Sequence, residues 1–165
     1  MKGMTRRELE ITDRAEILEI LDKCKYLHLG LCDGDEPYVV PMNYGYTMDE
    51  NGKLDFYLHG AVWGRKLDIM RKNPKIFAEM ECDTEPFAGD VACRYGLAYR
   101  SLMARGTAIF IEDPEEKMKA LSILMKTQTG GDFTFTEKLV KVVAIIVLIF
   151  PNIPQSAALC PRYVR

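Results

Sequence analysis

The sequence is poor in histidine and has no surplus of either charge. Only two histidines, His28 and His59, occur among its 165 residues, so we expect no metal site. The 22 Lys and Arg residues are balanced by 24 Asp and Glu residues, and the resulting formal charge of -2 argues against a nucleic-acid partner. Any bound anion must therefore be held by a local cluster of cations.

Long apolar runs are also missing. The longest run, Val142–Phe150, has nine residues, whereas a helix needs about 20 to cross a bilayer. The stretch Met1–Glu10 is charged rather than apolar, so we expect neither a secretory signal nor a membrane segment.

Cysteine is present, but its pattern does not indicate a zinc or redox site. The 5 cysteines are odd in number and lack the paired C-x-x-C spacing of such sites. We therefore expect free thiols and a cytoplasmic protein. The cysteines are Cys24, Cys32, Cys82, Cys93 and Cys160.

The length and hydrophobic content of the chain fit one core. Its mass is 18.8 kDa and 48% of its residues are hydrophobic, which suits a single domain. We predict that this domain covers residues 1–165, with an atypical tail at 151–165.

The beginning of the chain predicts a helix followed by a strand and a turn. Asp13, three residues before Glu16, is typical of a helix N-cap, and the apolar residues that follow predict a helix to about Lys23. Alternation of apolar and other residues predicts a strand over 26–32. A turn is expected at Asp33–Glu36.

Two further strands should follow. A strand over 38–46 contains Pro41, which removes a ladder donor and therefore predicts an edge or a bulge at that position. Asn51–Gly52 is a strong hairpin signal, and it leads into an alternating strand over 54–59.

The middle of the chain predicts a short helix and two strands. A helix over 64–72 should end at Asn73–Pro74, and a strand over 76–81 should follow. The Pro- and Gly-containing stretch 84–96 predicts a loop, and 97–112 predicts a long strand.

The last third predicts one more helix and a final strand. Asp113 and Pro114 cap a helix that should run through Lys126, and a polar connection should occupy 127–136. Residues 140–150 predict a final strand that is covered on both faces, because they are apolar throughout. This element order predicts an α+β fold that is mainly β, an antiparallel barrel with short flanking helices. A Rossmann fold is excluded, since no G-x-G-x-x-G follows a strand.

The segment Phe56–Lys66 suits a bound phosphate. A strand ends there, a turn of small residues follows, and a helix opens with Arg65 and Lys66. Free N–H groups and the positive end of the helix dipole favour an anion, and the two cations would add charged hydrogen bonds. The spacing alone leaves open an ordinary solvated first turn, because cations at a helix N-terminus are otherwise mildly unfavourable.

Two more segments carry polar groups on predicted strands. In Val39–Tyr46, Pro41 would leave neighbouring backbone groups unpaired and Asn43 can donate and accept, so a flat heterocycle could bind there. A bulged edge strand with surface tyrosines is the alternative. Arg100 and Ser101 place a guanidinium and a hydroxyl on one strand and indicate little by themselves.

Taken together, these segments resemble one known family. The chain is similar to the Nim-type (5-nitroimidazole resistance protein-like) branch of the pyridoxamine 5′-phosphate oxidase-related flavoproteins, over roughly Ile11 to Lys126. The resemblance rests on the helix that begins near Asp13 and on the segments V-V-P-M-N-Y-G-Y, F-Y-L-H-G-A-x-x-G-R-K-L-D-x-M-R-K-N-P and Y-R-S-L-M-A-R-G-T-A-x-F-I-E-D-P.

The resemblance implies a split β-barrel with Greek-key connections. It also implies a homodimer in which the two subunits together make two FMN sites at their interface. Carried over by motif, the cofactor residues are Arg65 and Lys66 at the phosphate, His59 near the phosphate and ribitol, Val40, Pro41, Met42 and Asn43 along the isoalloxazine edge, and Arg100 and Ser101 completing the site.

The implied chemistry is electron transfer through the flavin. A nicotinamide donor would reduce it, and a small acceptor such as a nitroaromatic would receive the electrons, so no catalytic side chain is assigned. The alternatives are a non-catalytic flavin- or haem-binding module, a pyridoxamine 5′-phosphate oxidase, and a ligand-free dimerisation domain. The oxidase ranks low because the phosphate-binding basic residues expected near the end of those enzymes are not evident in Pro151–Arg165.

The end of the chain departs from this family. Members usually close with alternating valine and acidic residues and a polar Gly-Lys tail, whereas Val142–Phe150 is unbroken apolar and 151–165 contains prolines and Cys160. The sequence therefore does not determine how the last strand packs. An apolar run left uncovered would favour aggregation.

Overall fold

The computed structural model describes residues 7–150 and 156–160, and for Arg7 and 156–160 it describes the backbone alone. Within these residues one nine-stranded antiparallel sheet is joined by helices. The strands are β1 (Glu10–Ile11), β2 (Leu27–Asp33), β3 (Glu36–Met42), β4 (Gly45–Met48), β5 (Leu54–Gly60), β6 (Lys75–Phe87), β7 (Gly96–Ile111), β8 (Ala144–Ile149) and β9 (Ser156–Cys160). The helices are α1 (Arg14–Lys23), α2 (Arg65–Lys72), α3 (Pro114–Thr129) and α4 (Glu137–Val140), with short 3-10 turns at Arg7–Leu9 and Ala92–Arg94.

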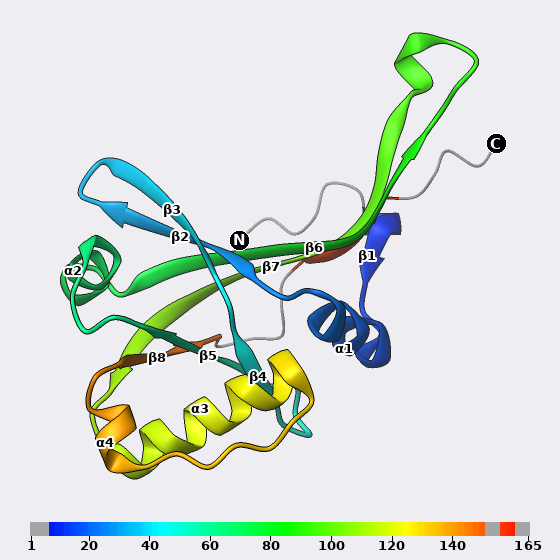
Figure 1. The fold of residues 1–165 in the computed structure, drawn as a ribbon. Coiled ribbons are helices and arrows are strands. Elements are labelled where there is room, and N and C mark those ends of the chain that lie inside the picture. Colours follow the sequence, from blue (N-terminus) through cyan, green and yellow to red (C-terminus); the bar gives the residue numbers. More distant parts are fainter. Residues whose placement is uncertain (1–6, 151–155, 161–165) are drawn as a thin grey trace.

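The sheet curls into a split barrel whose two end strands, β3 and β4, do not pair with each other. Its strands follow the order β3-β2-β6-β7-β8-β5-β4, so β3 and β4 stand at opposite ends of the order. These two strands are separated in sequence only by Asn43 and Tyr44, which brings the two ends together. Figure 1 shows β3 continuing into β4 along one curved path. The architecture confirms the split β-barrel expected from the sequence.

The predicted strand 38–46 breaks two residues later than Pro41. β3 pairs with β2 without interruption, and Pro41 lies opposite His28. Because β3 is an edge strand in the sheet order, the missing N–H of proline removes no ladder bond on its outer side. The break falls at Asn43–Tyr44, where the fully buried Tyr44 turns into the core.

Helix α1 begins and packs as its sequence predicts. The Asp13 side chain accepts a hydrogen bond from the Glu16 N–H at 3.0 Å and caps the first turn. The Tyr44 hydroxyl lies 2.7 Å from the carbonyl oxygen of Leu21 near the end of the helix. The buried residues of α1 are Ile17, Ile20 and Leu21.

Helix α3 covers β4 and β5 on the outside of the barrel. Asp113 caps its start, Pro114 occupies the first turn, and Gly130 ends it with φ 74°. The helix therefore runs three residues past the predicted end at Lys126, and the connection predicted to begin at 127 begins later. On β4, a Cβ added to Gly45 would stand 2.4 Å from the Cα of Leu124, so the two backbones touch.

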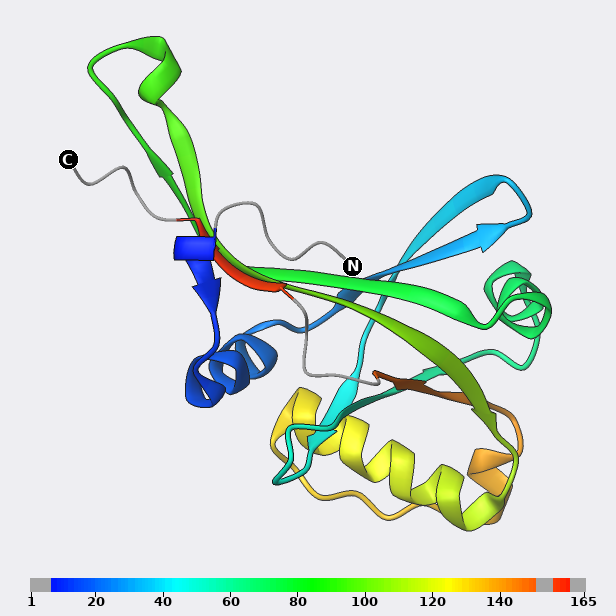
Figure 2. The ribbon, with the colours of Figure 1, turned by 180° about the vertical axis from the view of Figure 1, so that it is seen from behind.

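The strands β6 and β7 extend beyond the barrel as a two-stranded arm (Figures 1 and 2). The loop predicted over 84–96 is shorter than expected, because Phe87 still pairs with Gly96. A Cβ added to Gly96 would stand 2.5 Å from Cζ of Phe87. The absence of a side chain at Gly96 therefore leaves room for the aromatic ring. The arm departs from the barrel at Asp83, where φ is 55° and the strand register shifts.

The end of the chain differs from the prediction of one final strand over 140–150. Val140 ends the short helix α4, β8 begins only at Ala144, and β9 follows, pairing with β1 and β7. The residues of β8 lie between the barrel core and α3, and Ile145, Ile146 and Leu148 are buried. The apolar run is thus largely covered, while residues 151–155 and 161–165 of the tail lie outside the described residues.

The core of the barrel is aromatic at its centre. Phe56 contacts Tyr44 at a ring-centroid distance of 5.0 Å and Phe150 at 5.1 Å, and all three side chains are fully buried.

No helix of the described residues combines the length and apolar character needed to cross a membrane. Four cysteines are free thiols, as expected, and the side chain of Cys160 is outside the described residues.

Candidate functional site

The turn after β5 leads directly into α2, as predicted. Gly64 precedes the helix with φ 138° and offers no side-chain oxygen to cap it. The N–H groups of the first helical turn and the positive end of the helix dipole therefore face this turn without a side-chain cap. An anion is the partner that such a helix start suits.

The Lys66 side chain lies over the last residue of β5. A Cβ added to Gly60 would stand 3.4 Å from Cε and 3.7 Å from Nζ of Lys66. Gly60 thus leaves the space that the lysine side chain fills, next to His59, which is exposed at the end of β5. Among the ion pairs of the described residues, none includes Lys66.

Arg65 is oriented differently. Its Nη2 lies 2.9 Å from Oε2 of Glu36 and 3.4 Å from Oδ2 of Asp33, both at the turn between β2 and β3. Its guanidinium also stacks 5.0 Å from the ring centroid of Tyr38. Arg65 therefore already has two carboxylate partners, which an incoming phosphate would have to displace. These partners were not predicted, because the contact joins residues about 30 positions apart.

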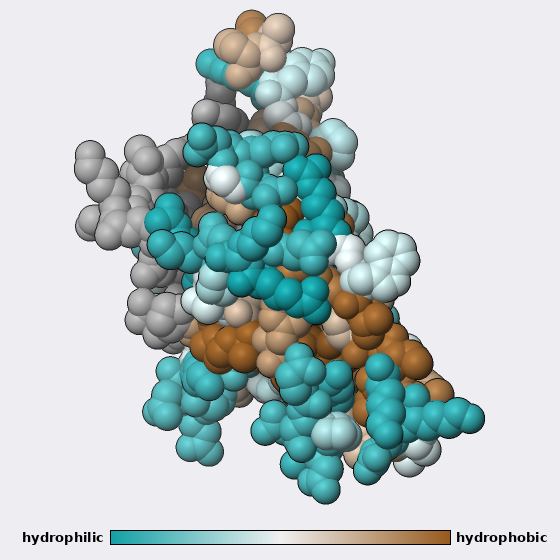
Figure 3. Space-filling view, turned by 90° about the vertical axis from the view of Figure 1, so that its left-hand side faces the viewer, coloured by the Kyte–Doolittle hydropathy of each residue, from teal (hydrophilic) through white to brown (hydrophobic). Residues whose placement is uncertain are grey.

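The residues predicted to line a flat ring lie on β3. Pro41 is exposed, Val40 is half-buried and Met42 is buried. The Asn43 side chain donates to the carbonyl oxygen of Lys25 at 3.0 Å, so it also fixes the start of β2. Because β3 begins at Glu36, beside Arg65, the strand connects the start of α2 to this segment. Figure 3 views the side of the molecule that carries α2 and shows hydrophobic residues in a band between hydrophilic ones.

Arg100 and Ser101 lie elsewhere, beside α1. Arg100 is 9% exposed, and its Nη1 donates to Oε2 of Glu19 at 2.9 Å. Its Nε donates to Oδ2 of Asp83 at 2.7 Å, and Glu16 lies 3.8 Å away. The hydrogen bond from Arg100 is the main cause that lowers the pKa of Glu19 to about 2. Ser101 is buried at 5% exposure.

Within one chain, the structure brings together part of the predicted site. His59, Arg65 and Lys66 share the end of β5 and the start of α2, and β3 adjoins them. Arg100 is separated from this group: α1 and α2 lie at opposite ends of the barrel in Figure 1. Gly106 pairs with Ile76, which lies near α2, and Arg100 lies six residues before Gly106 on β7. Six residues of a strand span about 20 Å.

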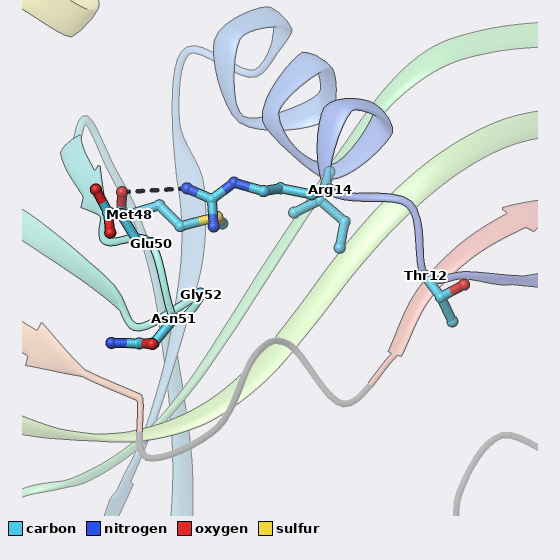
Figure 4. Close-up of a pocket in the computed structure, with 7 residues that line it drawn as sticks. Thr12, Arg14, Met48, Glu50, Asn51 and Gly52 are labelled. Atoms are coloured by element: carbon cyan, nitrogen blue, oxygen red, sulfur yellow. Dashed lines mark hydrogen bonds between the residues drawn. The ribbon is translucent and has the colours of Figure 1, made fainter.

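A hollow of about 210 Å³ lies near Arg14, between α1 and the turn after β4 (Figure 4). Arg14 donates from Nη1 to the carbonyl oxygen of Asp49 at 2.8 Å and from Nη2 to that of Met48 at 3.4 Å. None of the predicted cofactor residues lines this hollow. Arg14 there joins the helix to the turn, which is a structural role.

Comparison with known proteins agrees with the fold. No curated protein matches the chain. A candidate 5-nitroimidazole antibiotic resistance protein from Bacteroides thetaiotaomicron is 28% identical, with a TM-score of 0.74 over 87% of this chain and 83% of that one. The flavocytochrome Anf3 from Azotobacter vinelandii is 16% identical, with a TM-score of 0.72 over 98% and 84%. The FAD and heme binding protein from Mycobacterium smegmatis is 15% identical, with a TM-score of 0.71 over 92% and 83%.

The class that the fold defines is that of antiparallel split β-barrels with short flanking helices. The sequence pattern of the pyridoxamine 5′-phosphate oxidase family matches residues 13–145. The chain therefore belongs to the pyridoxamine 5′-phosphate oxidase family, as the resemblance of its motifs indicated.

Proposed function

We propose that this protein binds FMN, with the phosphate at the start of α2 and the isoalloxazine ring along β3. The observation that carries the proposal is the Lys66 ammonium beside Gly60 at a helix start that has no side-chain cap. Arg65 would join it after leaving Asp33 and Glu36, and His59 would lie near the phosphate and ribitol. The ring would then follow Val40, Pro41, Met42 and Asn43.

We propose an oxidoreductase activity for this site. Bound FMN would supply electron transfer from a nicotinamide donor to a small acceptor such as a nitroaromatic. The likeness to a candidate 5-nitroimidazole antibiotic resistance protein supports this acceptor class. The side chains of the chain itself would bind and orient the flavin, and none is assigned as acid or base. A cytoplasmic location, which the free thiols support, would supply such a donor.

We further propose that the protein is a homodimer with cofactor sites at its interface. Arg100 and Ser101 lie at the other end of the barrel from Lys66, so a second copy would have to supply them to a shared site. Val62 and Trp63, which are 47% and 80% exposed directly before the N-cap Gly64 of α2, support a further contact at this place. Dimerisation is testable by sedimentation at several protein concentrations.

A second candidate function is a non-catalytic module that stores or delivers its cofactor. The similarity to a flavocytochrome and to an FAD and heme binding protein favours it over a ligand-free domain. Binding of haem together with an absence of turnover would support this alternative. Turnover of NADH or NADPH with a nitroimidazole would support the oxidoreductase.

The binding proposal is tested by titrating the purified full chain with FMN and recording flavin fluorescence. We expect Lys66→Ala to weaken binding at least about tenfold, because a charged hydrogen bond to phosphate is lost. Arg65→Ala should have a smaller effect, since Arg65 begins in ion pairs with Glu36 and Asp33. The matched control is Lys72→Ala, at the far end of the same helix.

The outcomes separate clearly. Unchanged affinity in Lys66→Ala, with the helix intact by circular dichroism, would exclude the phosphate site at α2. Absence of any flavin in the purified protein, together with no binding of added FMN, would instead favour the ligand-free dimerisation domain.

A further inference from the structure

Three potential metal ligands meet on the outer face of the barrel, on β2 and β6. His28 on β2 lies directly opposite Glu79 on β6, and Glu81 projects from the same face two residues further on. The Nδ1 atom of His28 is 3.0 Å from Oε2 of Glu79 and 3.9 Å from Oε2 of Glu81. One donor atom from each residue lies within 4.8 Å of the other two. We refer to these residues as the His28 cluster.

The spacing of the His28 cluster fits a small divalent ion. Zinc binds imidazole nitrogen and carboxylate oxygen at about 2.0–2.2 Å, so two ligands of a tetrahedral site are about 3.4 Å apart. The distances from His28 to Glu79 and Glu81, 3.0 and 3.9 Å, lie on either side of this value. Because all three donor atoms lie within 4.8 Å of one another, side-chain rotations would be enough to place one ion among them.

The charges of the His28 cluster also favour a cation. The two carboxylates of Glu79 and Glu81 are close together, and in the described part of the chain both pair with His28. A divalent ion would relieve the repulsion between these like charges.

The imidazole of His28 is held in position by its neighbours. The ring of Tyr26 packs edge-on against it, with ring centroids 5.5 Å apart and an interplanar angle of 85°. All three ligands stand on paired strands rather than on loops, which fixes their backbones. The side chains remain 31–37% exposed, so an ion can enter from solvent.

We propose that His28, Glu79 and Glu81 bind a divalent transition-metal ion of the zinc type. One imidazole nitrogen and two carboxylate oxygens would be its ligands, leaving at least one position for water or a substrate. The nitrogen ligand disfavours Mg²⁺ and Ca²⁺, which prefer oxygen. This proposal departs from the expectation of no metal site, because His28 and Glu79 are 51 positions apart and no spacing in the sequence indicates their contact. The proposal does not depend on flavin binding.

The test measures Zn²⁺ binding to the full chain after treatment with a chelator, by isothermal titration calorimetry. We expect one Zn²⁺ per chain. His28→Ala and the pair Glu79→Gln/Glu81→Gln should each weaken binding at least about tenfold. Zn²⁺ should also raise the melting temperature of the parent chain and not that of His28→Ala.

Two controls match these changes. His59→Ala removes the only other histidine, and Glu115→Gln/Glu116→Gln removes the same charge from the first turn of α3. Both should bind Zn²⁺ within about twofold of the parent. If His28→Ala does not fold, the single change Glu81→Gln, at a side chain 37% exposed, serves in its place.

The opposite results would overturn the proposal. One is equal affinity in the parent and in His28→Ala or Glu81→Gln, and another is an absence of saturable Zn²⁺ binding. A third is a Co²⁺ complex whose absorption shows thiolate charge transfer, since the His28 cluster contains no cysteine and such a band would assign the ion to a thiol.

Discussion

Arg100 donates a hydrogen bond to Asp83 at the point where β6 and β7 leave the barrel and form the arm. The Nε of Arg100 donates to Oδ2 of Asp83 at 2.7 Å, and Asp83 holds the positive φ of 55° at the shift in register. Arg100 also donates to Glu19 on α1. One nearly buried guanidinium therefore joins the first helix, the bend of β6 and the strand β7.

The first prediction is that Arg100→Met makes the protein less stable and less sensitive to acid. The pKa of Glu19 is lowered to about 2, and that of Asp83 is also lowered, by Lys23 first and then by Arg100. A lowered pKa stabilises the folded chain above the unfolded pKa, and this stabilisation is lost as pH falls toward the folded value. The free energy of unfolding, measured with urea, should therefore fall less steeply between about pH 5 and pH 2 in the variant than in the parent.

At neutral pH, Arg100→Met should lower the free energy of unfolding by less than the loss of a fully buried ion pair would, because the Glu19 and Asp83 side chains are 50% and 39% exposed. The control is Arg105→Met, an exposed arginine on the same strand. It should leave both the stability and the acid profile nearly unchanged. Equal acid profiles for the parent and Arg100→Met would contradict the prediction.

The local patterns of the sequence predicted the elements whose ends are set by neighbouring residues. Asp13 and Asp113 cap α1 and α3 as expected, because an N-cap acts on backbone atoms two or three residues away. The strand over 84–87 was missed because Pro86 and Glu85 are poor strand residues, and their strand is held by pairing with Leu97 and Ala98.

The candidate site was predictable only in part, for the same physical reason. Gly64, Arg65 and Lys66 are adjacent in sequence, so a helix start could be expected from them. The ion pairs of Arg65 with Asp33 and of Arg100 with Glu19 depend on the tertiary fold. No spacing in the sequence indicates them.

The second prediction concerns the contact between β4 and α3. In Gly45→Ala the new Cβ would stand 2.4 Å from Cα and 2.6 Å from N of Leu124, and backbone atoms cannot move aside as a side chain would. We expect a loss of about 3 kcal/mol in the free energy of unfolding, measured by urea denaturation. The control is Gly30→Ala, whose Cβ would stand 3.3 Å from the carbonyl oxygen of Phe77. It should cost no more than about 1 kcal/mol, and equal costs would disprove the close approach.

The third prediction concerns the buried hydroxyl of Tyr44. It lies 2.7 Å from the carbonyl oxygen of Leu21 and 3.1 Å from that of Cys24, at the end of α1. Tyr44→Phe should destabilise the chain by about 1–2 kcal/mol, because a buried carbonyl loses its donor. Tyr57→Phe removes a hydroxyl that contacts Thr47 at 3.2 Å in an exposed position, and it should cost about 0.5 kcal/mol or less. An unchanged free energy of unfolding in Tyr44→Phe would mean that water replaces the lost hydrogen bond.

The fourth prediction rests on the proposed flavin site. Glu36 and Asp33 hold the Arg65 guanidinium at 2.9 and 3.4 Å, and these bonds compete with a phosphate for the same cation. The double change Asp33→Asn/Glu36→Gln should therefore strengthen FMN binding by about threefold or more, which corresponds to about 0.7 kcal/mol, within the range of exposed ion pairs. The same change made together with Arg65→Ala should bring no gain over Arg65→Ala alone. If the double change still strengthens binding when Arg65 is Ala, the two carboxylates repel the phosphate directly rather than through Arg65. If the double change alone weakens binding, the carboxylates hold Arg65 in the orientation that binds FMN.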